Sequence, residues 1–384
     1  MYKLPTMTQR LTQLIASPSV SSTDISWDQS NRPVIDLLAQ WLTALGFAVE
    51  ILPLKHAPHK ANLIATLGQG DGGLVFAGHT DTVPYSNSGW SSSPFELLEK
   101  DDKWYGLGTC DMKGFFSVVI EALLPIAQQP LKAPIIIVAT ADEESSMSGA
   151  RELVALSKPK ARFAVIGEPT NMTPIYKHKS IAMQKITVTG KAGHSSNPEL
   201  GINAIEIMHL VTSKLITYRQ NMQKHYSDSA FKVAVPTMNF GCIHGGDNPN
   251  RICASCELHF DTRLLPGMSP AEVTSDIEGI LQALAKEQNC NITLEPLING
   301  VEPFYQPLDS TLVDTAVSLT KQQPEAVSFA TEAPYLRSMG IDTLVMGPGS
   351  IDQAHQSNEF LEKSTVAPAI NILQGLIRQF CLVN

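Results

Sequence analysis

Hydrophobic and polar positions divide the first half of the chain into short apolar runs and amphipathic stretches that alternate in order. Leu74–Gly78 and Ile135–Thr140 are continuous apolar runs, which are typical of buried strands. The same reading predicts strands at 47–52, 62–67 and 164–166 and helices at 8–16, 33–46, 115–124 and 147–157. This alternation predicts an α/β fold, with a mainly parallel sheet and helices on both faces.

The pattern changes after residue 178 and returns near residue 294. Between these points we expect an antiparallel sheet with two long helices: strands at 181–190, 237–243, 251–263 and 291–297, and helices at 202–225 and 270–288. A helix at 309–320, a strand at 342–346 and a helix at 365–381 follow. We therefore predict a discontinuous α/β domain (1–178 and 294–384) that is interrupted by an inserted α+β domain (179–293).

Composition and charge exclude several classes of function. The chain of 384 residues is 43% hydrophobic, carries a formal net charge of −9 and has no run of Lys or Arg, so we expect no nucleic-acid partner. No apolar segment is long enough to span a bilayer and the first ten residues are polar, so we expect no membrane partner and a cytoplasmic protein. Six cysteines are few for this length and fit reduced thiols. Cys253 and Cys256 have C-x-x-C spacing but no second pair, so we interpret them as buried strand residues.

Metal-ligating residue types follow the predicted strands of the α/β domain. Each lies at a strand end or at a turn beside one: His79, Asp81, Asp111, Glu143, Glu144, Glu168 and His355. Because the carboxyl ends of parallel strands meet at one edge of a sheet, we expect these side chains to converge. Singly, each has a simple structural explanation, such as a solvated loop or a helix cap. Together, two His and several carboxylates suit a divalent metal such as zinc.

Asp111 is the natural bridge between two metal ions, because a Gly-x-Gly turn precedes it and a carboxylate has two oxygens. Two His and two Glu would complete the ligands, and the Glu that remains could take a proton from a water between the ions. Asp81 stands two residues after His79, so in an extended segment it could contact that imidazole from behind and fix its tautomer.

Other residues are candidates for substrate contacts. Asn250 and Arg251 could clamp a substrate carboxylate, since guanidinium groups match carboxylates; the alternative is an Arg in solvent at a strand edge. Gly347 and Gly349 could offer backbone N–H groups to the same carboxylate. Glu332 could face a distal ammonium of the substrate, or be merely a carboxylate at a helix N-terminus.

Four motifs resemble a known family. Gly78–Pro84, Gly108–Gly114, Ala141–Glu144 and Gly167–Thr170, in this order and spacing, are similar to the dizinc peptidase family that includes aminoacylase, the glutamate-type carboxypeptidase and succinyl-diaminopimelate desuccinylase. Further stretches resemble its deacetylating members in particular: Ala141–Arg151, Gly193–Ser196, Gly241–Asp247, Asn250–Cys253 and Gly347–Ser350. The resemblance implies a hydrolase that releases acetate from an N-acetylated amino acid, with desuccinylase or broad aminoacylase activity as the alternative.

The resemblance also implies roles for individual residues. His79, Asp111 and Glu168 would hold one zinc ion, and Asp111, Glu144 and His355 the other, with cobalt able to substitute. Glu143 would be the general base and acid, and Asp81 would orient His79. The peptide bond after Asp111 is expected to be cis, and Cys110 beside it to point away from the metals.

The inserted domain has a role in the same family. There it serves as a dimerisation and lid domain, so a homodimer is expected. His194 would stabilise the oxyanion across the dimer interface, or alternatively only cap the long helix that follows it. Glutathione is a further cofactor that the resemblance alone suggests.

Overall fold

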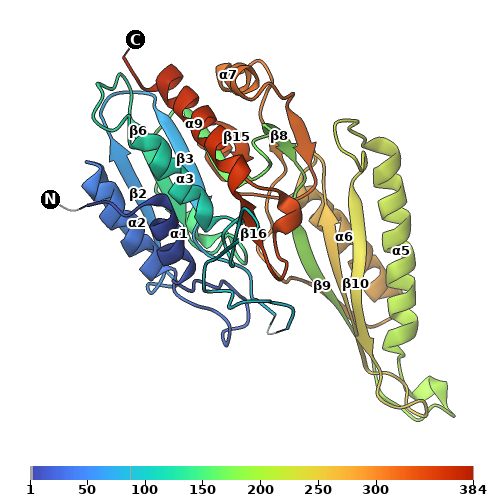
Figure 1. Cartoon of the computed structure of the whole chain (residues 1–384). Helices are drawn as coiled ribbons and strands as arrows, with labels where there is room; N and C mark the ends of the chain where they lie inside the picture. The colour runs from blue at the N-terminus through green and yellow to red at the C-terminus, as the bar shows by residue number, and fades with distance from the viewer. Residues whose placement is uncertain (1–2, 87, 384) are drawn as a thin grey trace. The chain divides into compact units, whose positions relative to one another are not determined.

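The computed structural model describes residues 3–86 and 88–383, which form two units (Figure 1). Unit 1 contains the described residues up to Tyr176, Gln306–Glu325 and the described residues from Thr331 onward; unit 2 contains Lys177–Tyr305 and Ala326–Ala330. The sequence-based boundary placed residues 294–305 in the α/β domain, whereas the structure places them in unit 2. The reason is that this segment stays hydrogen-bonded to the first strand region of unit 2, through Leu297 N to Met183 O and the Ile181–Val301 bridge.

Unit 1 is built on a sheet whose strand order is β1-β2-β6-β3-β7-β15. The four strands β6, β3, β7 and β15 are parallel to one another, and β2 and β1 extend the sheet beyond β6 with antiparallel pairing. Their bounds are β1 Ala48–Pro53, β2 Ala61–Leu67, β3 Leu74–His79, β6 Ile135–Thr140, β7 Phe163–Pro169 and β15 Asp342–Gly347. The predicted α/β fold is confirmed; the sheet is mixed, with the predicted parallel pairing at its centre.

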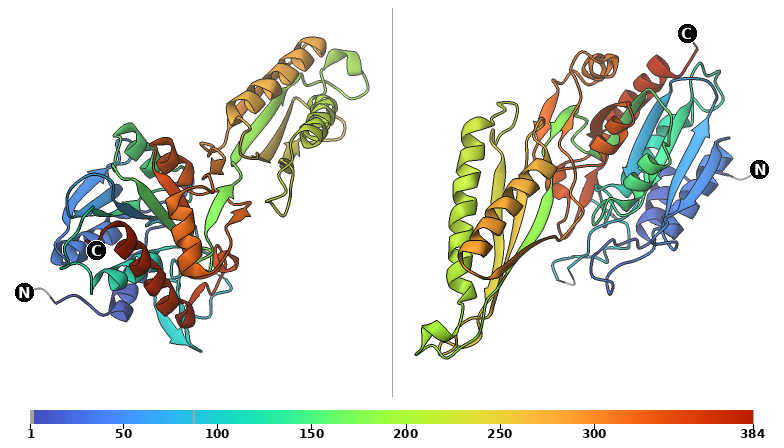
Figure 2. Two further views of the ribbon diagram at one scale, coloured as in Figure 1. Left: turned by 90° about the horizontal axis from the view of Figure 1, so that it is seen from above. Right: turned by 180° about the vertical axis from the view of Figure 1, so that it is seen from behind.

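Helices cover both faces of this sheet (Figures 1 and 2). Leu74 and Phe76 of β3 belong to the large core with helices α1, α2, α3 and α9, while Ala77 points to the opposite face, which α4 and α8 cover. The bounds are α1 Met7–Ile15, α2 Arg32–Ala44, α3 Lys113–Leu123, α4 Ser148–Ala155, α7 Thr311–Thr320, α8 Ala333–Ser338 and α9 Val366–Phe380. The central strands are therefore buried on both faces, as their continuous apolar runs require.

Several short elements were not predicted. They are β4 Leu98–Lys100, β5 Lys103–Tyr105 and β16 Phe360–Glu362, which form a separate three-stranded sheet, and β8 Ile175–His178, β13 Phe304–Tyr305, β14 Glu325–Val327, α8 and the 3₁₀ turns Pro198–Leu200, Ile351–Gln353 and Lys363–Thr365. Strands of two to four residues are too short for a period to be recognised, so tertiary pairing alone defines them.

Unit 2 is an α+β unit with an antiparallel sheet in the order β10-β11-β9-β12. One face carries Ile186 and Val188 of β9 and Leu258 of β11 into a core that α5 and α6 share, so that two helices cover one side of the sheet. The bounds are β9 Ala182–Thr189, α5 Ala204–His225, β10 Thr237–Gly245, β11 Ser255–Arg263, α6 Pro270–Glu287 and β12 Asn291–Pro296. Cys256 lies buried in β11 and Cys253 buried just before it. Among the described residues, no helix has both the length and the apolar character needed to cross a membrane.

Candidate metal centre

The central strands of unit 1 carry the predicted ligands to one edge of the sheet. His79 is the last residue of β3, and Glu168 lies near the end of the neighbouring parallel strand β7. Glu143 and Glu144 follow β6, which lies on the other side of β3. The strand order therefore brings together acidic and imidazole groups from three successive strands, as the sequence predicted.

Asp111 stands between the two histidines. Its Oδ1 lies 3.2 Å from Nε2 of His79, and its Oδ2 lies 3.6 Å from Nε2 of His355. His355 Nε2 also lies 3.1 Å from a carboxylate oxygen of Glu144. One oxygen of Asp111 thus faces each imidazole, which is the disposition that a carboxylate shared by two ions needs.

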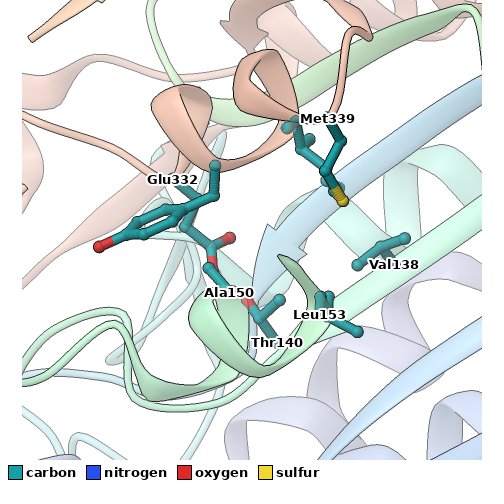
Figure 3. Close-up of a pocket in the computed structure, with 9 residues that line it drawn as sticks. Val138, Thr140, Ala150, Leu153, Glu332 and Met339 are labelled. Atoms are coloured by element: carbon teal, nitrogen blue, oxygen red, sulfur yellow. The ribbon is translucent and has the colours of Figure 1, made fainter. Parts of the chain in front are cut away.

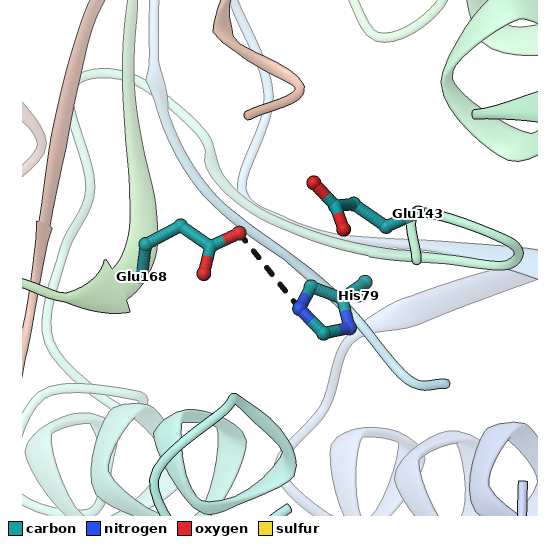
Figure 4. A group of neighbouring side chains, drawn as sticks. All are labelled: His79, Glu143 and Glu168. Atoms are coloured by element: carbon teal, nitrogen blue, oxygen red, sulfur yellow. Dashed lines mark ion pairs between the residues drawn. The ribbon is translucent and has the colours of Figure 1, made fainter. Parts of the chain in front are cut away.

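Two further carboxylates complete the cluster (Figure 4). Glu168 Oε1 lies 3.8 Å from His79 Nε2. One donor atom from each of His79, Glu143 and Glu168 lies within 4.8 Å of the others, and the same holds for His79, Asp111 and Glu144. All the predicted ligands and the predicted base therefore meet in one place in unit 1.

The tautomer of His79 follows from its hydrogen bonds. Its Nδ1 lies 3.0 Å from the main-chain carbonyl oxygen of Asp81, which can only accept, so Nδ1 carries a proton and Nε2 is the nitrogen that faces the cluster and could bind a metal ion. The sequence assigned this contact to the Asp81 carboxylate, which in fact lies 3.8 Å from Nδ1. That carboxylate instead accepts hydrogen bonds from the backbone N–H groups of Glu143 (3.3 Å) and Glu144 (3.0 Å), so it holds the turn that presents both.

The concentration of buried carboxylates in the cluster favours the binding of cations. Burial raises the pKa of Glu143 and of Glu168 well above the ordinary value, and neighbouring carboxylates raise both further. Burial lowers the pKa of His79, but the Asp111 hydrogen bond and the nearby Glu charges outweigh it and raise that pKa well above its usual range. The Glu144 hydrogen bond raises the pKa of His355 to about 9. In the metal-free protein, protons therefore occupy positions that divalent ions would fill.

A buried lysine supports the turn that carries Glu143. Lys60 is 4% exposed, and its Nζ lies 2.6 Å from Asp28 and 2.6 Å from Asp142. Asp142 adopts a φ of 61° and also accepts a hydrogen bond from Ser21. No sequence pattern pointed to Lys60, because its partners lie 32 and 82 positions away.

The segment around Asp111 has the predicted peculiarities. The Asp111–Met112 peptide bond is cis, as expected. Cys110 is buried, and its thiol donates to the carbonyl oxygen of Ser350 at 3.5 Å. Burial and then the Glu359 charge raise the pKa of Cys110 well above its usual value, so the thiol keeps its proton and faces the 349–350 loop.

Gly347, the last residue of β15, and Gly349 just after it both have structural roles. Gly347 donates its N–H to Thr170 Oγ1 at 3.3 Å. This N–H group is therefore already bonded within the protein, whereas the sequence predicted that it would face a substrate carboxylate. A Cβ at Gly347 would lie 2.1 Å from the carbonyl oxygen of Gly167, which explains why the position is glycine. Gly349 adopts a φ of 82°, which favours glycine, and its carbonyl oxygen accepts from Asn171 N.

Glu332 lies at the start of α8, but its carboxylate does not cap that helix. The side chain is 3% exposed and lines a small apolar cavity with Thr140, Ala150 and Met339 (Figure 3). Burial raises its pKa to about 7, and among the described residues its Oε1 has no hydrogen-bond partner. Glu332 is therefore a carboxylate at a helix N-terminus, as one of the two predictions had it, but it is buried and makes no capping hydrogen bond.

His194, Asn250 and Arg251 lie in unit 2, whereas the metal-ligating cluster lies in unit 1. Nδ1 of His194 accepts the backbone N–H of Ser196 at 3.2 Å, so Nε2 carries the proton and is a donor. The long helix α5 is capped by Asn203 instead, which removes the capping explanation for His194. Arg251 is exposed and pairs with Asp247 at 2.6 Å.

The donor set fits a pair of divalent ions: two imidazoles and at least three carboxylates, with one carboxylate oriented to both imidazoles. Such a site at the carboxyl edge of a mainly parallel sheet defines a metal-dependent hydrolase. The comparison with known proteins agrees: the profile of peptidase family M20/M25/M40 matches residues 75–379, and the chain belongs to this family.

Relatives match the chain from end to end. It is 46% identical over 382 residues to the acetylornithine deacetylase of Photorhabdus laumondii, covering 100% of this chain and 99% of the relative. It is also 46% identical over 381 residues to that of Pasteurella multocida, covering 99% and 100%. Among solved structures, a metallo-carboxypeptidase of the M20 family from Sulfolobus solfataricus superposes with a TM-score of 0.77 at 17% identity, covering 98% of this chain and 99% of that one. A dinuclear metal binding M20 peptidase from Bacillus subtilis gives a TM-score of 0.67 at 15% identity, covering 97% and 98%.

Proposed function

We propose that this protein hydrolyses the amide bond of N2-acetyl-L-ornithine, giving acetate and L-ornithine in arginine biosynthesis. The observation that carries the proposal is the cluster around Asp111, on a chain that matches acetylornithine deacetylases over its whole length. The other members of the class, a desuccinylase or a broad aminoacylase, would use the same cluster and differ only in the acyl group and side chain that they accept.

Two zinc ions per subunit fit the cluster, and cobalt suits the same ligands. His79, Asp111 and Glu168 would hold one ion; Asp111, Glu144 and His355 would hold the other. When bound, such a pair polarises the amide carbonyl group and lowers the pKa of water, which makes a nucleophile available near neutral pH.

The protein groups move the protons. Glu143 is the carboxylate of the cluster that is not assigned as a ligand to either ion. Its raised pKa suits a group that acts first as a base and then as an acid. It takes a proton from the attacking water and returns it to the leaving α-amino nitrogen. Asp81 holds Glu143 and Glu144 through their backbone N–H groups, so the base and a ligand are positioned together.

Unit 2 would supply the remaining contacts. His194, with its proton on Nε2, is equipped to donate to the oxyanion that forms on the acyl carbon. Arg251 with Asn250 would bind the α-carboxylate, for which Arg251 must exchange its Asp247 partner for the substrate. In unit 1, the buried carboxylate of Glu332 is the candidate partner of the distal ammonium.

The substrate assignment is tested with purified protein that is freed of metal by a chelator and then given zinc or cobalt. We expect metal-dependent release of ornithine, with kcat/KM for N2-acetyl-L-ornithine well above that for N-succinyl-L,L-diaminopimelate or N-acetyl-L-methionine. Metal-dependent turnover with the order of preference reversed would assign the runner-up activity instead. No turnover of any of these substrates with two ions bound would refute the proposal.

We also propose a cytoplasmic homodimer in which His194 serves the partner's site. Mixing inactive E143Q and H194A proteins, after reversible dissociation, tests this directly. A heterodimer would then have one site with Glu143 and a partner His194 both intact, and random pairing predicts recovery of about a quarter of the wild-type activity. If His194 serves its own subunit, the mixture stays inactive.

A further inference from the structure

Glu359 was not predicted to have any role. In the described parts of the chain, its carboxylate accepts hydrogen bonds from more backbone N–H groups than any of the candidate metal ligands does. It is 1% exposed. Its Oε1 accepts the backbone N–H groups of Cys110 at 2.7 Å and of Asp111 at 2.9 Å. Its Oε2 accepts the N–H of Gly108 at 2.9 Å. One side chain therefore satisfies three backbone donors of the turn that ends at Asp111.

The same residue belongs to the segment that carries His355. It follows that histidine by four positions, and its carbonyl oxygen accepts the N–H of Gly106 at 3.0 Å. The Cys110 thiol adds a contact to Ser350 on the other side of His355. The 106–111 turn and the 350–359 segment are thus tied together both before and after His355, through contacts that span 240 or more positions of sequence.

These two segments present the two groups that share an ion in the ligand assignment above. Asp111 Oδ2 and His355 Nε2 lie 3.6 Å apart. Each is on a loop, so contacts between the two loops contribute directly to this spacing. Three converging N–H groups need an acceptor with two oxygens, which is why a carboxylate is required there; without it, buried donors would lose their partners.

We infer that Glu359 is a positioning residue for the metal pair: by holding the Asp111 turn against the His355 segment, it sets the distance between these two ligands and thereby the affinity for divalent ions. This inference rests on the ligand assignment of the proposed function, though not on the identity of the substrate. Residues that orient metal ligands in this way commonly change metal affinity about 10- to 100-fold when they are substituted.

The test measures metal binding by the whole protein without substrate. Metal-free wild type, E359Q and E359A are titrated with zinc against a competing chelator, and with cobalt while its visible absorption is followed. We expect E359A to bind at least one of the two ions about 10- to 100-fold more weakly, with an altered cobalt spectrum. E359Q should show a smaller loss, since its amide oxygen can keep the bonds to Cys110 and Asp111 and only the Gly108 donor loses its acceptor.

A matched control lies three residues further on. Glu362 is exposed in β16 and lies 3.7 Å from Lys103 at the surface, so E362Q should keep the wild-type affinity for both ions. Wild-type affinity and spectrum in both Glu359 variants would overturn the inference, even if their melting temperatures fell, because a purely structural role would affect stability alone. If wild type binds two ions but does not deacetylate acetylornithine, the proposed substrate fails and this inference stands or falls on the titration.

Discussion

Replacing Glu143 by Gln separates proton transfer from metal binding. The substitution keeps the shape of the side chain but removes the only carboxylate of the cluster to which no ion is assigned. His79, Asp111, Glu144, Glu168 and His355 are all committed as ligands in the proposed site, so none of them can replace the base. The backbone N–H of residue 143 keeps its bond to the Asp81 carboxylate, so the turn should keep its place.

The size of the effect follows from these contacts. General base catalysis by a positioned side chain contributes about 10²- to 10⁴-fold. Because the cluster offers no substitute and the carboxylate lies within 4.8 Å of donor atoms of both His79 and Glu168, we expect the upper half of this range. A loss of about 10³- to 10⁴-fold in kcat corresponds to about 4 to 5 kcal/mol in the barrier. KM should change little, since no substrate contact is assigned to Glu143.

The assay pairs steady-state deacetylation with metal analysis of the same sample. E143Q should retain two ions per subunit and a wild-type melting temperature. E143D, whose carboxylate is drawn back by about 1.5 Å, should retain intermediate activity. E152Q on α4 is the matched control, because that side-chain oxygen accepts a hydrogen bond from Lys55 N at the surface and should leave kcat unchanged. More than a tenth of wild-type kcat in fully loaded E143Q would refute the assignment of the base, and loss of an ion would make Glu143 a ligand.

Three further predictions concern pH, stability and specificity. Burial raises the pKa of Glu332 to about 7 and the Glu144 contact raises that of His355 to about 9, so these groups hold protons in the folded metal-free protein that the unfolded chain releases at lower pH. The folded metal-free protein therefore loses stability as the pH rises from about 5 to 9. The gain in melting temperature on adding zinc should grow between pH 6 and 8. A gain in melting temperature that becomes smaller over this range would contradict the electrostatic explanation. Lys60→Met leaves Asp28 and Asp142 without their cation and should lower the free energy of unfolding by about 3 kcal/mol in urea titration, whereas Lys158→Met at the exposed Glu50 pair should cost less than about 1 kcal/mol. Glu332→Gln should reduce kcat/KM for N2-acetyl-L-ornithine about tenfold and leave that for N-acetyl-L-methionine, whose side chain carries no charge, unaffected. An equal loss for both substrates would contradict a contact with the ammonium group.

Local pattern was sufficient to find the main elements of the fold. The predicted strand at 135–140 coincides with β6, and the predicted helix at 270–288 ends one residue beyond α6. Continuous apolar runs indicated strands buried on both faces, and such strands occur with parallel pairing and helices on both sides. Elements of two to four residues and the small helix α8 were missed, since they exist only through what they pair with.

The candidate ligands were also predicted, because they lie at or after the ends of strands that meet at one edge: His79, Glu143, Glu144, Glu168 and His355. Three details differ from the sequence interpretation. The Asp81 carboxylate accepts hydrogen bonds from the 143–144 turn, and it is the main-chain carbonyl oxygen of Asp81 that contacts His79. The N–H of Gly347 is bonded to Thr170. Residues 294–305 belong to unit 2. Each depends on which neighbour a backbone group meets, and sequence spacing carries no information on that.

The sequence by itself determined the periodicity of the elements, the two-part organisation and the chemical types of the candidate ligands, because these are properties of neighbouring positions. Tertiary structure alone decided that one oxygen of Asp111 faces each histidine and that Glu359, 248 positions away, holds the Asp111 turn. The physical reason is that these distances are set by strand order and loop-to-loop hydrogen bonds. Such contacts form between segments that are remote in the chain, so no local window of residues encodes them.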